Sequence, residues 1–365
     1  MPHEPHRNFK QKGVASDIGR SIGFVAGGIG DQIYHLTQLR ALAGISQTGT
    51  IDIACITPGP MSRILAATPW VGRVVDARPI RRYLPGMRGS AAVGALRLHR
   101  YDSAFILHRS TSFKLAAAFA RIPFRAGLAD SWLDRLLLQA PLALSSGGAR
   151  RSVWGHRPFI AAIDEYLVDL GLVLDEDTPT ILPDRSATSQ AKAFVEGLAG
   201  PVVVINLFVQ GEGRRWPIDA AIDTLAELAE TTGGTFILNA GPDAAEYHRA
   251  AIVAWHERCA KNRRIKKGQL IDSLGPDASM ERDIALYHLA DAYLGVDSFT
   301  ANLAMNCNLP AVILFAAQRD RLAYRSRVAP LAPDSRGDLR SLGAASIAQS
   351  LDTMLASRAT QPLPV

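Results

Sequence analysis

The chain has 365 residues, of which 48% are hydrophobic and 20% are charged, and its formal net charge is +6. This length suggests two domains, and the composition is that of a globular protein rather than a disordered or fibrous one. The longest apolar run, residues 136–144, is interrupted by Gln139 and Pro141 and is well short of the ~18 residues that a membrane-spanning helix needs. We therefore expect no transmembrane helix.

The first twenty residues are rich in His, Lys, Arg and Gly and lack the apolar segment of a secretion signal. We expect residues 1–20 to be a disordered leader. The three cysteines, Cys55, Cys259 and Cys307, are odd in number, widely spaced and set among apolar residues. This pattern fits buried thiols in a reducing compartment better than disulfides or a zinc site, and it predicts a cytoplasmic protein.

Strands and helices alternate along the first half of the chain. The hydrophobic pattern predicts strands at residues 21–26, 51–56, 73–75, 103–107 and 124–127, and helices at residues 32–43, 61–67 and 112–121. Such alternation is typical of a mostly parallel sheet with helices on both faces. We assign residues 21–172 to an N-terminal Rossmann-like domain.

A second alternating series follows residues 173–187, where prolines and acids break the pattern and indicate a linker. The series predicts strands at residues 202–207, 235–239, 269–272, 292–296 and 311–315, and helices at residues 189–197, 218–230, 244–259, 280–289 and 300–306. Residues 188–340 would form a C-terminal Rossmann-like domain, and residues 341–365 a helix and tail. The fold class predicted is α/β, with two doubly wound parallel-sheet domains facing across a cleft and ligands beyond the carboxyl ends of the strands.

The glycine-rich segment 27–31 joins the first strand to its helix. A dinucleotide-binding fingerprint would place a third glycine where Ile33 stands and an acid at the end of the second strand, so a nicotinamide cofactor is disfavoured. Gly28 and Gly30 still allow the backbone to approach a ligand closely. Asp31 either caps the helix or acts as a general base toward a hydroxyl group, and the sequence leaves both roles open.

Three further strand ends carry polar residues. The loop after the strand at 202–207 contains Arg214 and Arg215, and arginine forks bind phosphate in bidentate fashion, although exposed arginines are common. Asp297-Ser298 stands where a strand gives way to a helix, a corner suited to anions, although the pair could equally cap that helix. Asp243 and Glu246 follow another strand, where a carboxylate could hold ribose hydroxyls or cap the next helix.

The nine histidines show no metal-ligand spacing with cysteines or acids, so no metal site is predicted. Arginines accumulate in the first half of the chain, at positions 73, 78, 81, 82, 88, 97 and 100. They form either a solvated basic face or a surface for an anionic glycolipid. Few aromatic residues accompany them, so a nucleic-acid partner is not expected.

Taken in order, these segments resemble glycosyltransferase family 9, the ADP-heptose:lipopolysaccharide heptosyltransferases, over roughly residues 22–355. Gly30-Asp31 matches the family's Gly-Asp after the first strand, and residues 214–217 match its Lys/Arg-x-Trp-Pro loop. Residues 289–304 look like its Ala-Asp-x-x-x-Gly-x-Asp-Ser/Thr-Gly-x-x-His segment, which cradles the diphosphate. Here Phe299 replaces the glycine and Asn302 the histidine.

The resemblance implies the GT-B fold, with the acceptor bound mainly by the first domain and the nucleotide sugar mainly by the second. It implies a base at Asp31 and a donor and diphosphate site that contains Gln210, Arg214, Arg215, Asp297, Ser298, Thr300 and Asn302. Asp243 and Glu246 are the ribose or base candidates, and the acceptor-side loops contain Gly28, Gly30, His108 and Arg109.

The reaction implied is an inverting, metal-independent transfer without a cofactor, from an ADP-linked heptose to the lipopolysaccharide core or another anionic glycan. Peripheral association with the inner membrane surface is one expectation, and the oligomeric state is left open. Two alternatives remain: a sugar-nucleotide 2-epimerase with the same fold, and a noncatalytic protein that binds nucleotides or glycans.

Overall fold

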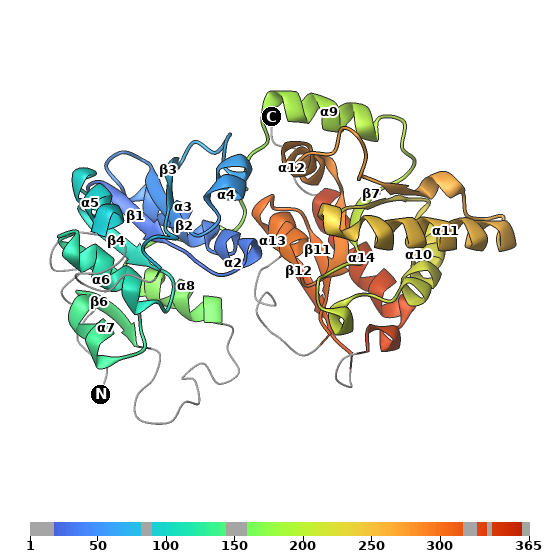
Figure 1. Cartoon of the computed structure of the whole chain (residues 1–365). Coiled ribbons are helices and arrows are strands. Elements are labelled where there is room, and N and C mark those ends of the chain that lie inside the picture. Colours follow the sequence, from blue (N-terminus) through green and yellow to red (C-terminus); the bar gives the residue numbers. More distant parts are fainter. Residues whose placement is uncertain (1–17, 82–89, 144–158, 317–326, 334–337, 360–365) are drawn as a thin grey trace. The chain divides into compact units, whose positions relative to one another are not determined.

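The computed structural model describes residues 18–81, 90–143, 159–316, 327–333 and 338–359 (Figure 1). The chain divides into two compact units, residues 1–176 and 177–365, and this division falls inside the predicted linker. Ile18 belongs to the segment expected to be a disordered leader. It is instead buried and forms an isolated parallel β-bridge with Ser46. No helix among the described residues is both long enough and apolar enough to cross a membrane.

The first unit is built on a six-stranded parallel sheet with the order β3-β2-β1-β4-β5-β6. Its strands are β1 (Ser21–Phe24), β2 (Ile51–Cys55), β3 (Val71–Asp76), β4 (Ser103–Ile106), β5 (Phe124–Ala129) and β6 (Ala140–Ala143). Its helices are α2 (Ile29–Ile33), α3 (Leu36–Gly44), α4 (Pro58–Ile64), α5 (Ser90–Leu98), α6 (Thr111–Phe119), α7 (Trp132–Leu137) and α8 (Phe159–Asp169). The central strands are buried throughout, as expected of a parallel sheet covered on both faces.

The predicted helix at 32–43 is two helices, because the chain turns at Tyr34-His35 between α2 and α3. The buried side chain of Gln32 donates to the carbonyls of Gly27 and Gly28 and ties α2 to the preceding loop. Gln32 is thus a buried polar residue that bonds to its own loop, and hydrophobic periodicity does not reveal such a contact. Helices α5, α7 and α8 and strand β6 were not predicted.

The second unit repeats this plan with the strand order β12-β11-β10-β7-β8-β9. Its strands are β7 (Val202–Asn206), β8 (Thr235–Leu238), β9 (Leu270–Asp272), β10 (Ala292–Val296), β11 (Ala311–Leu314) and β12 (Val328–Leu331). Its helices are α9 (Arg185–Val195), α10 (Ile218–Thr232), α11 (Ala245–Lys261), α12 (Met280–Leu289), α13 (Phe299–Asn306) and α14 (Ala344–Ala359). Strand β12 was not predicted, because Pro330 within it is tolerated only at an edge.

Each sheet contains one place where the strand order reverses direction. In the first unit this switch point lies between β1 and β4, and in the second it lies between β7 and β10. Loops that leave neighbouring strands there diverge to opposite faces of the sheet and leave a crevice at the carboxyl edge. The two doubly wound domains confirm the predicted fold class, and their switch points indicate where ligands would bind.

Candidate functional site

Asp31 lies at the switch point of the first sheet, exposed in the first turn of α2 directly after β1. Gly28 is the N-cap, and Asp31 occupies the third helical position, where its Oδ2 accepts a hydrogen bond from the Gly28 N–H at 3.0 Å. Asp31 therefore does help to cap the helix, as the sequence left open, but from the third helical position rather than as the N-cap residue. Gly27 has φ +105°, and a Cβ there would lie 2.7 Å from the Asp31 carboxylate, so this turn requires glycine.

His108 follows β4, the strand that pairs with β1, and so reaches the same switch point from the other side. Its Nδ1 accepts a hydrogen bond from the Ser110 N–H at 3.1 Å, so the neutral ring carries its proton on Nε2. Burial lowers the pKa of His108, and the charges of Arg81, Lys114 and Arg109 lower it further, while the Asp31 carboxylate opposes them. The ring is therefore a neutral donor at pH 7 in the electrostatic reach of Asp31.

A buried ion pair holds the loops after β4 and β5. Lys114 Nζ lies 3.1 Å from Asp134 Oδ2, and both side chains are almost completely buried. Asp134 also accepts hydrogen bonds from the Thr111 hydroxyl and from the N–H groups of Asp130 and Ser131. Lys114 donates to the carbonyl oxygen of Arg109 as well. Sequence analysis missed this pair, whose only signal is the Ser131-x-x-Asp134 pattern of a helix start.

Arg109 is exposed beside this ion pair, and its Nε lies 3.5 Å from Asp130 Oδ2. Buried Lys114 thus fixes the backbone of Arg109, in the loop that also contains His108. Gly30 lies within α2, and Gly28 starts that helix. The structure brings this predicted set together at one edge of the first sheet.

The corresponding corner of the second unit contains Arg214 and Asp297. The Arg214 guanidinium donates through Nη2 to the carbonyl oxygen of Asp297 at 2.6 Å and to its Oδ2 at 3.2 Å. The two residues are 83 positions apart in sequence, one in the loop after β7 and the other directly after β10. The structure thus joins two predicted motifs at the switch point.

Asn206, the last residue of β7, organises this corner and was missed by sequence analysis. Its buried Nδ2 donates to Ser298 Oγ at 3.0 Å and to Thr300 Oγ1 at 2.7 Å, while its Oδ1 accepts from the Phe208 N–H. Ser298 is the N-cap of α13, but its hydroxyl does not accept from a helix N–H. The Ser298 side chain therefore does not cap the helix, and that alternative is wrong for Ser298. Thr300 is buried and holds the Asn206 amide in this corner through its hydroxyl.

The remaining donor-side candidates are held by different contacts. Gln210 Nε2 donates to Asp243 Oδ2 at 3.1 Å, which joins the loops after β7 and β8. Asp243 does not cap α11, whose N-cap is Ala244, and Glu246 is exposed in the first turn of that helix. Asn302 Nδ2 donates back to the carbonyl oxygen of Ser298, within the start of α13.

Arg215 is part of the scaffold of its own loop. Its Nε donates to the carbonyl oxygen of Val209, and its guanidinium lies over the rings of Phe208 and Tyr247, with its carbon 4.5 and 5.7 Å from the ring centres. Such stacking fixes a guanidinium plane. Of the two neighbouring arginines, Arg214 is therefore directed to the switch point and Arg215 to the loop interior.

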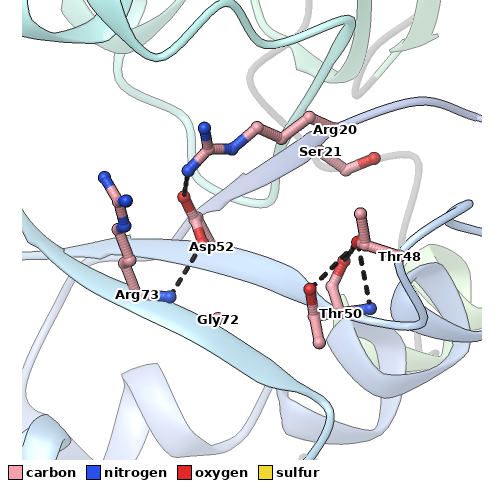
Figure 2. Close-up of a pocket in the computed structure, with 7 residues that line it drawn as sticks. All are labelled: Arg20, Ser21, Thr48, Thr50, Asp52, Gly72 and Arg73. Carbon is pink, nitrogen blue, oxygen red and sulfur yellow. Dashed lines mark hydrogen bonds and ion pairs between the residues drawn. The ribbon is translucent and has the colours of Figure 1, made fainter.

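A cavity of about 400 Å³ lies at the opposite, amino edge of the first sheet (Figure 2). Asp52, one of the residues that line it, accepts hydrogen bonds from the Tyr101 hydroxyl, from Arg20 Nη2 and from the Arg73 N–H. A Cβ at Gly72 would lie 2.3 Å from the same carboxylate, so glycine is needed there. These bonds tie the amino ends of neighbouring strands together, and none of the predicted site residues lines this cavity.

No protein-family model and no curated protein matches the sequence. Solved structures do match. Heptosyltransferase II from Escherichia coli, an ADP-heptose lps heptosyltransferase, superposes with a TM-score of 0.68 at 16% identity over 93% of this chain and 100% of that chain. A family 9 glycosyltransferase from Veillonella parvula superposes with a TM-score of 0.69 at 14% identity, over 93% of this chain and 97% of that chain.

E. coli heptosyltransferase WaaC with ADP-2-deoxy-2-fluoro heptose gives a TM-score of 0.59 at 16% identity over 92% of this chain and 99% of that chain. At such identities a structural likeness establishes the fold, and the switch points described above belong to that fold. The chain therefore has the GT-B fold of the family 9 glycosyltransferases, with two doubly wound α/β domains.

Proposed function

We propose that the protein is an inverting, metal-independent glycosyltransferase. It would move a sugar, heptose by its resemblance to family 9, from an ADP-linked donor to the lipopolysaccharide core or another anionic glycan. The observation that carries this proposal is the contact between Arg214 and Asp297, since it fixes an exposed guanidinium at the switch point where α/β sheets bind ligands.

The donor diphosphate would bind at this corner. Arg214 is exposed enough to offer its guanidinium to a phosphate, while the Asp297 carboxylate holds it in place rather than touching the phosphate itself. The first N–H groups of α13 are not capped by the Ser298 side chain and add their partial positive charge. Preorganised donors of this kind stabilise the charge of a departing diphosphate by roughly 3 to 4 kcal/mol each.

The acceptor hydroxyl would meet Asp31. As the hydroxyl oxygen forms its bond to the anomeric carbon, the proton passes to the Asp31 carboxylate. The bond from that carbon to the diphosphate breaks, and its electron pair leaves with the phosphate. His108, a neutral donor near Asp31, would orient the acceptor through Nε2–H.

Two observations support ADP as the nucleotide of the donor. The resemblance implies ADP, and the similar WaaC structure contains ADP-2-deoxy-2-fluoro heptose. The contact between Gln210 and Asp243 places polar side chains of two loops together, where ribose hydroxyls could be held. A thermal-shift panel of ADP, UDP, GDP and CDP would rank the bases, since a ligand at 100 times its Kd stabilises a protein by about 2.7 kcal/mol.

Replacing Arg214 tests the site directly. Arg214→Ala should weaken nucleotide diphosphate binding by about 1.5 to 3 kcal/mol, as expected for the loss of a charged hydrogen bond. Arg215→Ala is the matched control, because it removes an equal charge from the neighbouring position; it should lower the melting temperature and weaken binding less. Equal calorimetric affinities for the wild type and Arg214→Ala would remove Arg214 from the site. Donor binding without transfer to any acceptor would instead favour the noncatalytic alternative.

A further inference from the structure

Helices α5, α6 and α7 lie side by side on one face of the first unit (Figure 1). They present large apolar side chains to solvent: Leu98 is 84% exposed, Trp132 73%, Leu136 70% and Phe119 42%. Trp132 and Leu136 are four residues apart and so share one side of α7. Four of the seven large apolar side chains that are exposed in the described residues thus belong to these three helices.

The ends of α5 and α6 are joined at this face by an exposed side-chain contact. Arg97 donates through Nε and Nη2 to the carbonyl oxygen of Phe119, at 3.1 and 2.6 Å. Leu98 and Phe119 therefore belong to adjoining helix ends rather than to separate parts of the surface. We call the exposed side of α5, α6 and α7, with these four apolar side chains, the α5–α7 face.

Positive charge predominates on this face. Exposed arginines accompany the apolar side chains at positions 97, 100, 121 and 135. The only acid within the three helices is Asp134, which is buried against Lys114. Of the acids in the flanking loops, Asp130 faces Arg109 and Asp102 accepts a hydrogen bond from the backbone N–H of Arg20. The face is therefore apolar and cationic.

Two of these arginines occupy strained positions. Arg100 has φ 51° and Arg121 has φ 62°, and they follow the ends of α5 and α6, where glycine is the usual residue. Among the described residues only one other non-glycine residue, Asn308, has a positive φ. The fold alone would favour glycine at both places, so the side-chain charge supplies a reason for arginine that local structure does not.

We propose that the α5–α7 face binds to the surface of an anionic lipid bilayer. The Leu, Phe and Trp side chains would enter the interfacial layer while the arginines contact headgroup phosphates, a combination typical of peripheral membrane binding. A two-fold contact between copies of the chain fits less well, because it would set the same arginines against each other. The proposal concerns a surface distinct from the nucleotide corner, so it stands or fails separately from the proposed function.

Flotation of the full chain with phosphatidylcholine vesicles, with and without phosphatidylglycerol, tests the proposal. We expect binding only to the anionic vesicles and release by salt. Arg100→Gly and Arg121→Gly should each reduce the partition coefficient about fivefold, the effect of one basic residue at an anionic surface. Their melting temperatures should stay equal or rise, because glycine relieves the left-handed backbone. A merely structural arginine would not combine weaker binding with equal or greater stability.

Matched controls come from the second unit. Val253→Ser removes an apolar side chain that is 54% exposed on α11, and Arg263→Gly removes an exposed arginine. Both should bind vesicles like the wild type, whereas Trp132→Ser with Leu136→Ser should not bind. In the wild type, vesicles should shift the tryptophan emission to the blue, and Trp132→Phe should bind without most of that shift.

Three results would overturn the proposal. The first is equal vesicle binding by the wild type and the face variants. The second is an equal loss of binding in the two controls. The third is a dimer in sedimentation experiments that the Trp132→Ser, Leu136→Ser variant separates, without any binding of vesicles by the wild type. Nucleotide affinity should be unchanged in every one of these variants, which keeps this test apart from that of the transferase site.

Discussion

At the scale of single residues, the two units place polar side chains in corresponding positions. Asp31 follows β1 and Asp297 follows β10, each beside the switch point of its sheet. Their partners differ: Asp31 accepts from a backbone N–H at the start of its own helix, whereas Asp297 accepts from Arg214. The Asp31 carboxylate is therefore bound to its own helix, and the Asp297 carboxylate holds a cation in place.

The role of Asp31 can be separated from its place at the start of α2. In Asp31→Asn the amide oxygen can still accept from the Gly28 N–H, so the melting temperature should hardly change. The amide cannot take the acceptor's proton, so turnover should fall by roughly 10²- to 10⁴-fold. Steady-state kinetics and calorimetry measure the two quantities, and donor affinity serves as the control. Activity within a few-fold of the wild type would show that Asp31 is structural and that the base lies elsewhere.

Residues that act through tertiary contacts were the ones that the sequence could not reveal. Arg214, Asp297 and Ser298 stand at strand ends, where a polar residue after an apolar run is visible in the sequence. Asn206 falls inside the predicted strand at residues 202–207, where a polar residue gives no signal of a site, yet its amide organises Ser298 and Thr300. Lys114 resembles a surface lysine on an Ala-rich helix, and only the fold brings Asp134 against it.

At the scale of elements, the second unit was predicted more completely than the first. The predicted bounds of β10 and α12 coincide with those of the structure, because long apolar runs and a serine N-cap mark them. Strand β6, Ala140–Ala143, contains no β-branched residue, and α7 has only six residues, so neither has a clear periodic pattern. Helix α5 combines alanine and glycine with an exposed leucine, which weakens its amphipathic signal.

Helix α12 carries two partly buried titrating groups, Asp283 and His288, whose pKa shifts have opposite effects on stability. Burial lowers the pKa of His288 to about 4, assisted by the charge of Arg358. Burial raises the pKa of Asp283 to about 6, against the hydrogen bond from Asn239 and the charge of Arg282. On acidification from pH 6.5 to about 4, the unfolded chain gains a proton at His288 that the folded chain does not, so stability is lost. At Asp283 the folded chain gains the proton first, between about pH 6 and 3.8, so stability is gained.

Single substitutions should reveal these opposing contributions. Each shift exceeds two pKa units, and one unit corresponds to 1.36 kcal/mol, so each contribution amounts to about 3 kcal/mol and the two nearly cancel. In His288→Gln the free energy of unfolding should rise as the pH falls from about 6 to 4, and in Asp283→Asn it should fall over the same range. Urea unfolding at several pH values measures both slopes. Parallel slopes in the two variants would contradict this account.

At the scale of the whole molecule, the proposed mechanism takes the charge that would hold a diphosphate from protein groups in the second unit. Arg214 and the start of α13 converge on one corner, and among the described residues no cluster of three or more His, Cys, Asp and Glu side chains is arranged to hold a metal ion. Metal independence remains a prediction. Turnover should survive excess EDTA, and the control is a transferase known to require manganese under the same conditions. Activity that collapses with chelator and returns with magnesium or manganese would contradict the mechanism.

The repeated strand order has a consequence for how the protein can change. Each unit closes its own core and brings polar side chains to its own switch point, through Asn206 in one and through Lys114 and Asp134 in the other. In the proposed transferase, substitutions at the Arg214 corner would leave the separate core around Asp31 unchanged, and the converse would also hold. Selectivity for the donor and selectivity for the acceptor would then be separately inherited traits, and one could drift while the other stayed under selection.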